Sequence, residues 1–191
     1  MKAMILGEGR VAQALRHFLT RVPEGPLLLD SDGEPARADL LIGALSGRLG
    51  PRALDLALEL GKDLVDLSDV DPARIEERAP SIREAGIRVV PACGFCPGLV
   101  DHLIARETRG RPIRSVEVVA GTTSREPWYF PFLWCFEDLV AEFMESSRQL
   151  VEGRPVEQEP FAGYRREEIF GLEVESYFAA SGFEDLAGVL G

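Results

Sequence analysis

The chain contains few histidines, cysteines and lysines. Its 191 residues include two histidines, three cysteines and two lysines, the latter against nineteen arginines. With two lysines, a Schiff-base mechanism has few candidates. One Cys-x-x-Cys occurs, Cys93 to Cys96, and no second one completes a four-thiolate zinc site, so we expect no bound metal.

Long apolar segments are missing as well. No stretch approaches the ~18 consecutive apolar residues of a membrane span. The amino terminus enters an apolar strand at once, without the basic and apolar regions of a signal peptide. We therefore expect a cytoplasmic protein. The net charge of −11 would repel phosphates, which argues against nucleic acids and anionic membranes as partners.

The acidic excess is unevenly distributed. Residues 1–106 carry a net charge of −3 and residues 107–191 carry −8. A hydrophobic content of 46% suffices for one good core or for two small cores that share an interface. The two zones predict two domains, with a boundary at 106/107.

The most informative segment lies at the amino end. A short apolar strand, Ala3 to Leu6, leads into Gly7, Glu8, Gly9, Arg10, Val11 and Ala12. This is the layout of a dinucleotide-binding βαβ unit. In such a unit Gly7 permits a tight turn, Gly9 lets the backbone approach a pyrophosphate, and the small Ala12 lets the helix pack closely on the strand. The N–H groups at the helix start, Arg10 and Val11, then face the phosphates. The alternative is a βα turn with a purely structural role.

A second apolar strand, Leu27 to Leu29, ends on Asp30. A carboxylate there accepts hydrogen bonds from the ribose hydroxyls of NAD and repels a 2′-phosphate. Asp30 therefore favours NAD, while the nearby Arg37 keeps NADP possible. The alternative is that Asp30 forms a solvated turn with Asp32 and Gly33.

Strands and helices alternate through the first domain. We expect strands near Met4, Leu28, Leu41, Val65 and Val89, and helices over 10–20, 51–60, 71–85 and 100–106. This predicts an α/β fold with a parallel sheet covered on both faces. Between Asp30 and Asp39 a loop fits, but the helix, strand and second helix that usually follow do not. We therefore expect an abbreviated Rossmann-type sheet.

The second zone indicates a smaller, truncated α+β region. We expect a strand over 115–121, a helix over 136–151, an extended segment over 155–159 and further strands over 168–178. Aromatic residues cluster over 128–136, as core or interface or as the wall of a substrate cleft. An unfinished sheet would leave an exposed edge, so we expect a homodimer formed through Arg114 to Ala180.

The segment after Val90 carries a further motif. Gly94, Pro97, Gly98 and Leu99 are followed by Leu103 and Ala105. This resembles the saccharopine dehydrogenase-like family of nicotinamide-dependent reductases, in which the last Rossmann strand ends in Gly-x-Asp-Pro-Gly-Leu and the next helix ends in Leu-x-Ala. Segments 65–69, 84–86, 134–137 and 152–156 resemble further family motifs in the same order.

The resemblance implies an NAD(P)-dependent oxidoreductase that transfers a hydride to or from an imine or secondary amine derived from an amino acid. It also implies that Gly94, Pro97 and Gly98 lie beside the cofactor, and we add Ala44, where the third apolar run ends. Cys96 stands where the family has Asp, which removes a carboxylate from beside the expected nicotinamide.

Hydride transfer also needs a proton donor or acceptor within hydrogen-bond reach. The candidates are His102 with the adjacent Asp101, and Asp66 at the carboxyl end of a strand. Two alternatives remain open: a non-catalytic dinucleotide-binding or assembly protein on the same fold, and a thiol redox protein that uses Cys93 and Cys96.

Overall fold

The computed structural model describes residues 1–68, 70, 72–121 and 135–179. The chain divides into two units: unit 1 spans Met1–Gly98 and unit 2 spans Leu99–Gly191. The predicted aromatic cluster over 128–134 lies outside the described residues.

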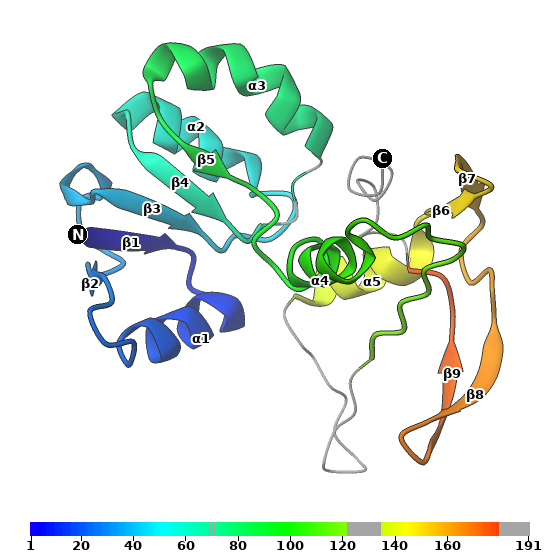
Figure 1. Cartoon of the computed structure of the whole chain (residues 1–191). Helices are drawn as coiled ribbons and strands as arrows, with labels where there is room; N and C mark the ends of the chain where they lie inside the picture. The colour runs from blue at the N-terminus through cyan, green and yellow to red at the C-terminus, as the bar shows by residue number, and fades with distance from the viewer. Residues whose placement is uncertain (69, 71, 122–134, 180–191) are drawn as a thin grey trace. The chain divides into compact units, whose positions relative to one another are not determined.

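Unit 1 is a five-stranded parallel sheet with helices on both faces (Figure 1). The strands pair in the order β2-β1-β3-β4-β5, where the bounds are β1 (Lys2–Leu6), β2 (Leu27–Leu28), β3 (Leu40–Gly43), β4 (Asp63–Asp66) and β5 (Val89–Val90). They are connected by α1 (Arg10–Leu19), a 3₁₀ turn η1 (Pro35–Arg37), α2 (Pro51–Leu60) and α3 (Pro72–Ala85). All five strands lie where the sequence predicts them, which confirms the α/β class.

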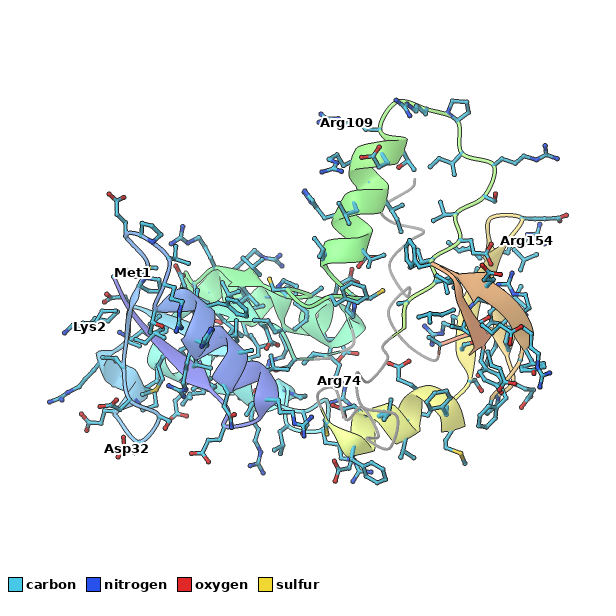
Figure 2. The ribbon with its side chains drawn as sticks, turned by 90° about the horizontal axis from the view of Figure 1, so that it is seen from below. Met1, Lys2, Asp32, Arg74, Arg109 and Arg154 are labelled. Atoms are coloured by element: carbon cyan, nitrogen blue, oxygen red, sulfur yellow. The ribbon has the colours of Figure 1, made fainter. Side chains whose placement is uncertain are left out.

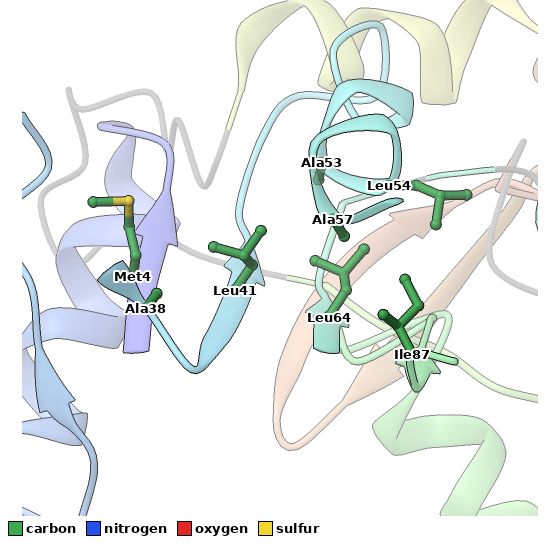
Figure 3. Close-up of a cluster of buried hydrophobic side chains, with 8 residues drawn as sticks. All are labelled: Met4, Ala38, Leu41, Ala53, Leu54, Ala57, Leu64 and Ile87. Carbon is green, nitrogen blue, oxygen red and sulfur yellow. The ribbon is translucent and has the colours of Figure 1, made fainter. Parts of the chain in front are cut away.

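Alternating side chains of β1 divide the core between the two faces of the sheet. Ala3 and Ile5 point to one side and pack with Ala12 of α1. Met4 points to the other side, into a cluster that α2 completes, shown in Figure 3. The buried members of that cluster are Met4, Ala38, Leu41, Ala53, Leu54, Ala57, Leu64 and Ile87. Because each face is apolar, a parallel sheet is the arrangement that buries both.

The connection from β2 to β3 crosses β1 without an α-helix. Its 3₁₀ turn is followed by Ala38, which is fully buried against Met4, so a short loop covers β1 where a helix usually lies. The abbreviated sheet predicted from the short Asp30–Asp39 spacing is confirmed.

The strand order reverses between β1 and β3. From β1 the chain moves outward to β2, returns past β1 to β3, and then continues in the opposite direction to β4 and β5. In open α/β sheets such a reversal leaves a crevice at the carboxyl ends of the two strands, where ligands bind. The crevice expected here lies beside Gly7, which follows β1.

Unit 2 contains α4 (Leu99–Thr108), α5 (Phe136–Met144) and two antiparallel hairpins. The first hairpin pairs β6 (Ser147–Val151) with β7 (Arg154–Gln158), and the second pairs β8 (Arg165–Ile169) with β9 (Leu172–Ser176). In both, the two turn residues have positive φ: Glu152 with Gly153, and Phe170 with Gly171. Two-residue turns of this kind match the twist of paired strands. The predicted α+β region is confirmed.

Two element predictions for unit 2 are wrong. The helix expected over 136–151 ends at Met144, and its last residues form β6 instead. Leu150 fits a helical stripe and an alternating strand equally well, and pairing with Pro155 across the hairpin decides between them. The strand expected over 115–121 does not form. Among the described residues no strand pairs with this segment, and Val119 in it remains 46% exposed.

Aromatic rings connect α5 to the second hairpin. Phe143 stacks on Phe161 with ring centroids 5.9 Å apart, and Tyr177 lies 5.4 Å from Phe161 and 5.3 Å from Tyr164. Many side chains of unit 2 remain exposed, among them Arg109 after α4 and Arg154 at the start of β7, both labelled in Figure 2. This ring cluster, rather than a closed apolar core, supplies the packing in this part of unit 2.

We predict that Gly43→Ala destabilises unit 1 by about 3 kcal/mol, because a β-carbon there would overlap Oδ1 of Asp66 on the neighbouring strand. Urea unfolding monitored by circular dichroism measures the loss. The double variant Gly43→Ala/Asp66→Ala removes the overlapping carboxylate, so its loss should be smaller than the sum of the two single losses. Additive losses would contradict this packing.

Candidate functional site

The glycine loop after β1 has a backbone that only glycine tolerates at its first position. Gly7 has φ +133°, and a β-carbon there would overlap the carbonyl oxygen of Ala44. Ala44 in turn donates its N–H to the Leu6 carbonyl at 2.9 Å. The end of β1 is therefore packed directly against the end of β3, and the turn into α1 is tight, as the role predicted for Gly7 requires.

The second glycine faces open space. A β-carbon on Gly9 would meet no atom within 4 Å. Gly9 is the N-cap of α1 and supplies no side chain to the helix end, and the first turn of the helix holds no acidic residue. The first backbone hydrogen bond of the helix runs from Gln13 N–H to the Gly9 carbonyl at 3.0 Å. The N–H groups of Val11 and Ala12 therefore lack partners within the helix and are available to an anion.

The start of α2 differs from that of α1. Pro51 has no N–H, and the Arg52 and Ala53 amides donate to the carbonyls of Leu49 and Gly50 at 3.0 and 2.9 Å. The amides of the first turn of α2 are thus already bonded. Of these two helix starts on the carboxyl edge of the sheet, α1 is the one that suits a phosphate.

A pocket of about 280 Å³ opens at the carboxyl end of β1, at the switch point between β1 and β3. Its apolar wall comes from the strand and from both flanking connections, and its polar wall from Glu8, Ser31 and Arg52. The apolar residues are Met4, Ile5, Leu6, Pro35, Leu45 and Leu56, with Gly7 beside them. An apolar cavity with a few convergent polar groups is the usual form of a small-molecule site.

Asp30 lies next to this pocket in the chain but is not part of its wall. Its carbonyl accepts the Gly33 N–H at 3.0 Å, so residues 30–33 form a turn, and its side chain is exposed. Ser31 is the residue of this turn that lines the pocket. Sequence reasoning named Asp30 and missed Ser31, Leu45 and Arg52. Leu45 and Arg52 follow β3, which lies on the other side of the switch point. Their position just after that strand could have identified them as pocket residues.

Asp66, at the end of β4, is buried, with 1% of its surface exposed. Its Oδ1 accepts the Ser68 N–H at 3.1 Å, while Oδ2 has no hydrogen-bond partner among the described residues. The Ser68 hydroxyl accepts the Leu45 N–H at 3.2 Å. Burial raises the pKa of Asp66, and the hydrogen bonds from Ser68 counter only part of that effect. Asp66 thus connects the ends of β3 and β4 through Ser68, and it is not among the residues that line the pocket.

The loop after β5 is also tightly folded. A β-carbon on Gly98, which has φ +134°, would overlap the carbonyl oxygen of Gly94, and the Cys96–Pro97 peptide bond is cis. Cys93 donates its N–H to the Asp66 carbonyl at 2.9 Å. Burial raises the pKa of the Cys93 thiol, whereas a redox-active thiol needs a lowered pKa. Cys93 and Cys96 are both free thiols, and this environment disfavours the thiol redox alternative.

Asp101 and His102 lie on α4, in unit 2, where His102 is exposed and Asp101 is half-buried. They belong to a different unit from the glycine loop, the pocket and Asp66. Their assignment as catalytic residues therefore stays a prediction, as does the homodimer through Arg114 to Ala180. Within the described residues, no helix is long and apolar enough to span a membrane.

The fold is thus an abbreviated Rossmann-type sheet with its glycine loop at the switch point. Saccharopine dehydrogenase (L-Glu forming) from Saccharomyces cerevisiae, solved in the apo form, has a similar structure, with a TM-score of 0.67 and 20% sequence identity. The match covers 98% of this chain and 52% of that one, so this chain spans about half the length of its structural neighbour. A structural similarity at this low sequence identity establishes that the two chains share a fold. No family model and no curated protein sequence matches the chain.

We predict that Asp66→Asn is more stable than the wild type at pH 7, and that this advantage shrinks towards pH 3. The raised pKa means that the folded state holds its proton more tightly than the unfolded state, so the wild type loses stability as the pH rises above 3.8. The neutral amide escapes that loss and can still accept the Ser68 N–H. Thermal unfolding between pH 3 and pH 8 should show the two curves separating as the pH rises. A wild type that gains stability over the variant with rising pH would contradict this assignment.

Proposed function

We propose that the chain binds a nicotinamide dinucleotide and acts as an oxidoreductase on an imine or secondary amine derived from an amino acid. The observation that carries the proposal is the open space in front of Gly9 at the uncapped start of α1, directly beside an apolar pocket. The similar fold of saccharopine dehydrogenase supports the cofactor class and the reaction class.

The residues present fit the pyrophosphate. Gly7 allows the close turn, Gly9 leaves room for the phosphates, and the N–H groups of Val11 and Ala12 can donate to them. Ala12 is fully buried against the sheet, which brings the helix start close to the strand end. In addition, Gln13 donates from Nε2 to the Glu8 carbonyl at 3.2 Å and fixes the loop.

The pocket fits the adenosine half of the dinucleotide. Its leucine, proline and methionine side chains suit the flat face of a purine, and about 280 Å³ is a volume for part of such a ligand rather than for all of it. Ser31 lines the pocket from the turn after β2, and Asp30, which the sequence predicts for the ribose, precedes it in the same turn. Ala44, whose carbonyl lies against Gly7, holds the glycine loop close to the end of β3.

The edge formed by the ends of β4 and β5 is assigned to the nicotinamide half, which supplies or accepts the hydride when bound. The loop with Gly94, Pro97 and Gly98 lies on this edge. Asp66 is buried there, and its main-chain carbonyl accepts the Cys93 N–H. Its carboxylate accepts the Ser68 N–H, so we give the side chain a role in holding the end of β4 together. His102 and Asp101 lie on α4 of unit 2, and they remain the proton donor or acceptor that the sequence predicts.

We predict that Gly9→Val weakens the binding of NADH and NADPH at least about tenfold, because the branched side chain fills the space that the phosphates need. Since that space is open, the melting temperature of the ligand-free protein should change little. Isothermal titration calorimetry measures both affinities, and differential scanning calorimetry checks the fold.

Unchanged affinity in Gly9→Val would contradict the proposed site. Oxidation of the reduced dinucleotide with a panel of 2-oxo acids and amines then tests the reaction. Tight binding without turnover across the panel would favour the non-catalytic dinucleotide-binding protein on the same fold.

A further inference from the structure

The second hairpin of unit 2 has an open edge. Within the described residues, β8 pairs with β9 and with no other strand (Figure 1). An isolated two-stranded sheet is at best marginally stable in water, and the outward N–H and C=O groups of an edge strand can pair with another strand. Arg165, Arg166 and Glu168 of β8 are exposed. The hairpin can therefore accept a further strand along β8 or along β9.

The tip of this hairpin exposes a phenylalanine. Phe170 is fully exposed, so its ring packs on no part of the chain that the structure describes. Its φ of +52° lies in the left-handed region, which glycine and asparagine adopt easily and a bulky side chain does not. Leu172, on the other side of the turn, is 52% exposed. Neither the turn nor the packing of unit 2 accounts for Phe170, whereas a contact with a partner does.

The charges along β8 make the strand complementary to a second copy of itself. They run Arg165, Arg166, Glu167, Glu168. When two copies of one strand pair antiparallel about a two-fold axis, one residue faces its own copy, and the residues on either side of it face each other. With Glu167 at the axis, Arg166 of each copy faces Glu168 of the other. Opposite charges directly across two strands stabilise the pairing.

The same register covers the hairpin tip. Three positions from the axis, Tyr164 of each copy faces Phe170 of the other, and aromatic pairs across strands are stabilising. Tyr164 is 48% exposed, so its ring can take this contact. The two Glu167 carboxylates face each other at the axis, which is unfavourable. Arg165 of each copy lies diagonally next to Glu167 of the other, on the same face of the sheet, and offsets that repulsion.

The other strand edges of the two hairpins are less suitable. About an axis at Val174, β9 would place Glu173 of each copy against Glu175 of the other, and like charges across two strands repel. In β7, Pro155 has no N–H to donate to a new strand. β6 begins at Ser147, which is buried. Charge and backbone both favour β8.

We propose that two copies of the chain associate through β8, antiparallel and with Glu167 at the two-fold axis, and so form a continuous four-stranded sheet. The interaction surface consists of the β8 edge together with Tyr164 and the Phe170 tip. This assigns the homodimer expected from the sequence to one strand and one register. The inference does not depend on the dinucleotide site proposed in unit 1.

Sedimentation equilibrium of the full chain measures the association, and the wild type should be a dimer. Arg166→Glu sets glutamates against glutamates across the axis, and Glu168→Arg sets arginines against arginines. Each variant alone should therefore associate at least about tenfold more weakly than the wild type. The double variant Arg166→Glu/Glu168→Arg restores opposite charges, so it should dimerise again.

A mixture of the two single variants tests the register directly. In a mixed dimer, both positions of the Arg166→Glu chain are acidic and both positions of the Glu168→Arg chain are basic. Every facing pair then has opposite charges, so an equimolar mixture should form a heterodimer although neither variant dimerises well alone. Because the mixture restores association, it also excludes misfolding of the variants as the cause of their weak self-association.

Two further variants serve as controls. Glu173→Arg makes the same charge reversal on β9, opposite Glu168 within the hairpin and away from the β8 edge, and should leave the association constant within about twofold. Phe170→Asn removes the exposed ring and supplies a residue that suits the turn. It should weaken association while the circular dichroism spectrum stays that of the wild type.

The proposal fails on any of three results. A wild type that stays monomeric at chain concentrations up to about 200 µM would overturn it. Single variants that dimerise as tightly as the wild type, or a mixture of them that does not associate, would show that β8 does not pair in this register. An equal weakening by Glu173→Arg would show that net charge, and not the β8 edge, governs association.

Discussion

The structure of unit 1 depends on how closely the backbone packs where its central strands end. At the end of β1, Gly7 leaves no room for a β-carbon against Ala44, and at the end of β3, Gly43 leaves none against Asp66. Each glycine lets one strand end approach the next. The closeness that results places the glycine loop, the pocket wall and the Asp66 carboxyl along one edge of the sheet. A single added methyl at either position would push that edge apart.

The abbreviated crossover between β2 and β3 sets the shape of the pocket. Where a helix would usually cover β1, this chain has a turn at Asp30–Gly33, the 3₁₀ segment and the buried Ala38. Ala38 is enough to cover Met4, but it leaves the carboxyl end of β1 open between Pro35 and Leu56. The short connection therefore leaves a crevice at the carboxyl end of β1. It left a small apolar pocket that two neighbouring connections close.

Much of unit 1 could be predicted from the sequence, because its strands are short apolar runs and its helices carry clear stripes. The roles of Gly7 and Ala12 also follow from local spacing, and the packing in the structure agrees with them. The pocket wall could not be predicted in the same way, because Ser31 and Arg52 come to line one pocket only through the strand order of the sheet. In unit 2, Leu150 fits both a helical and an alternating pattern. It lies in a strand because it pairs with Pro155 across the hairpin. The Glu152-Gly153 dipeptide was the local signal for that hairpin.

The two helix starts at this edge differ in the groups that they offer to an anion. The start of α1 has no side-chain cap and no acidic residue, so it attracts anions with backbone N–H groups and its dipole alone. The start of α2 has its first amides already bonded and carries instead a guanidinium that its own dipole opposes. Backbone donors act on any phosphate that reaches them, whereas a side chain on one wall acts only on a phosphate placed beside it. The first arrangement is the one that suits the pyrophosphate of the proposed dinucleotide.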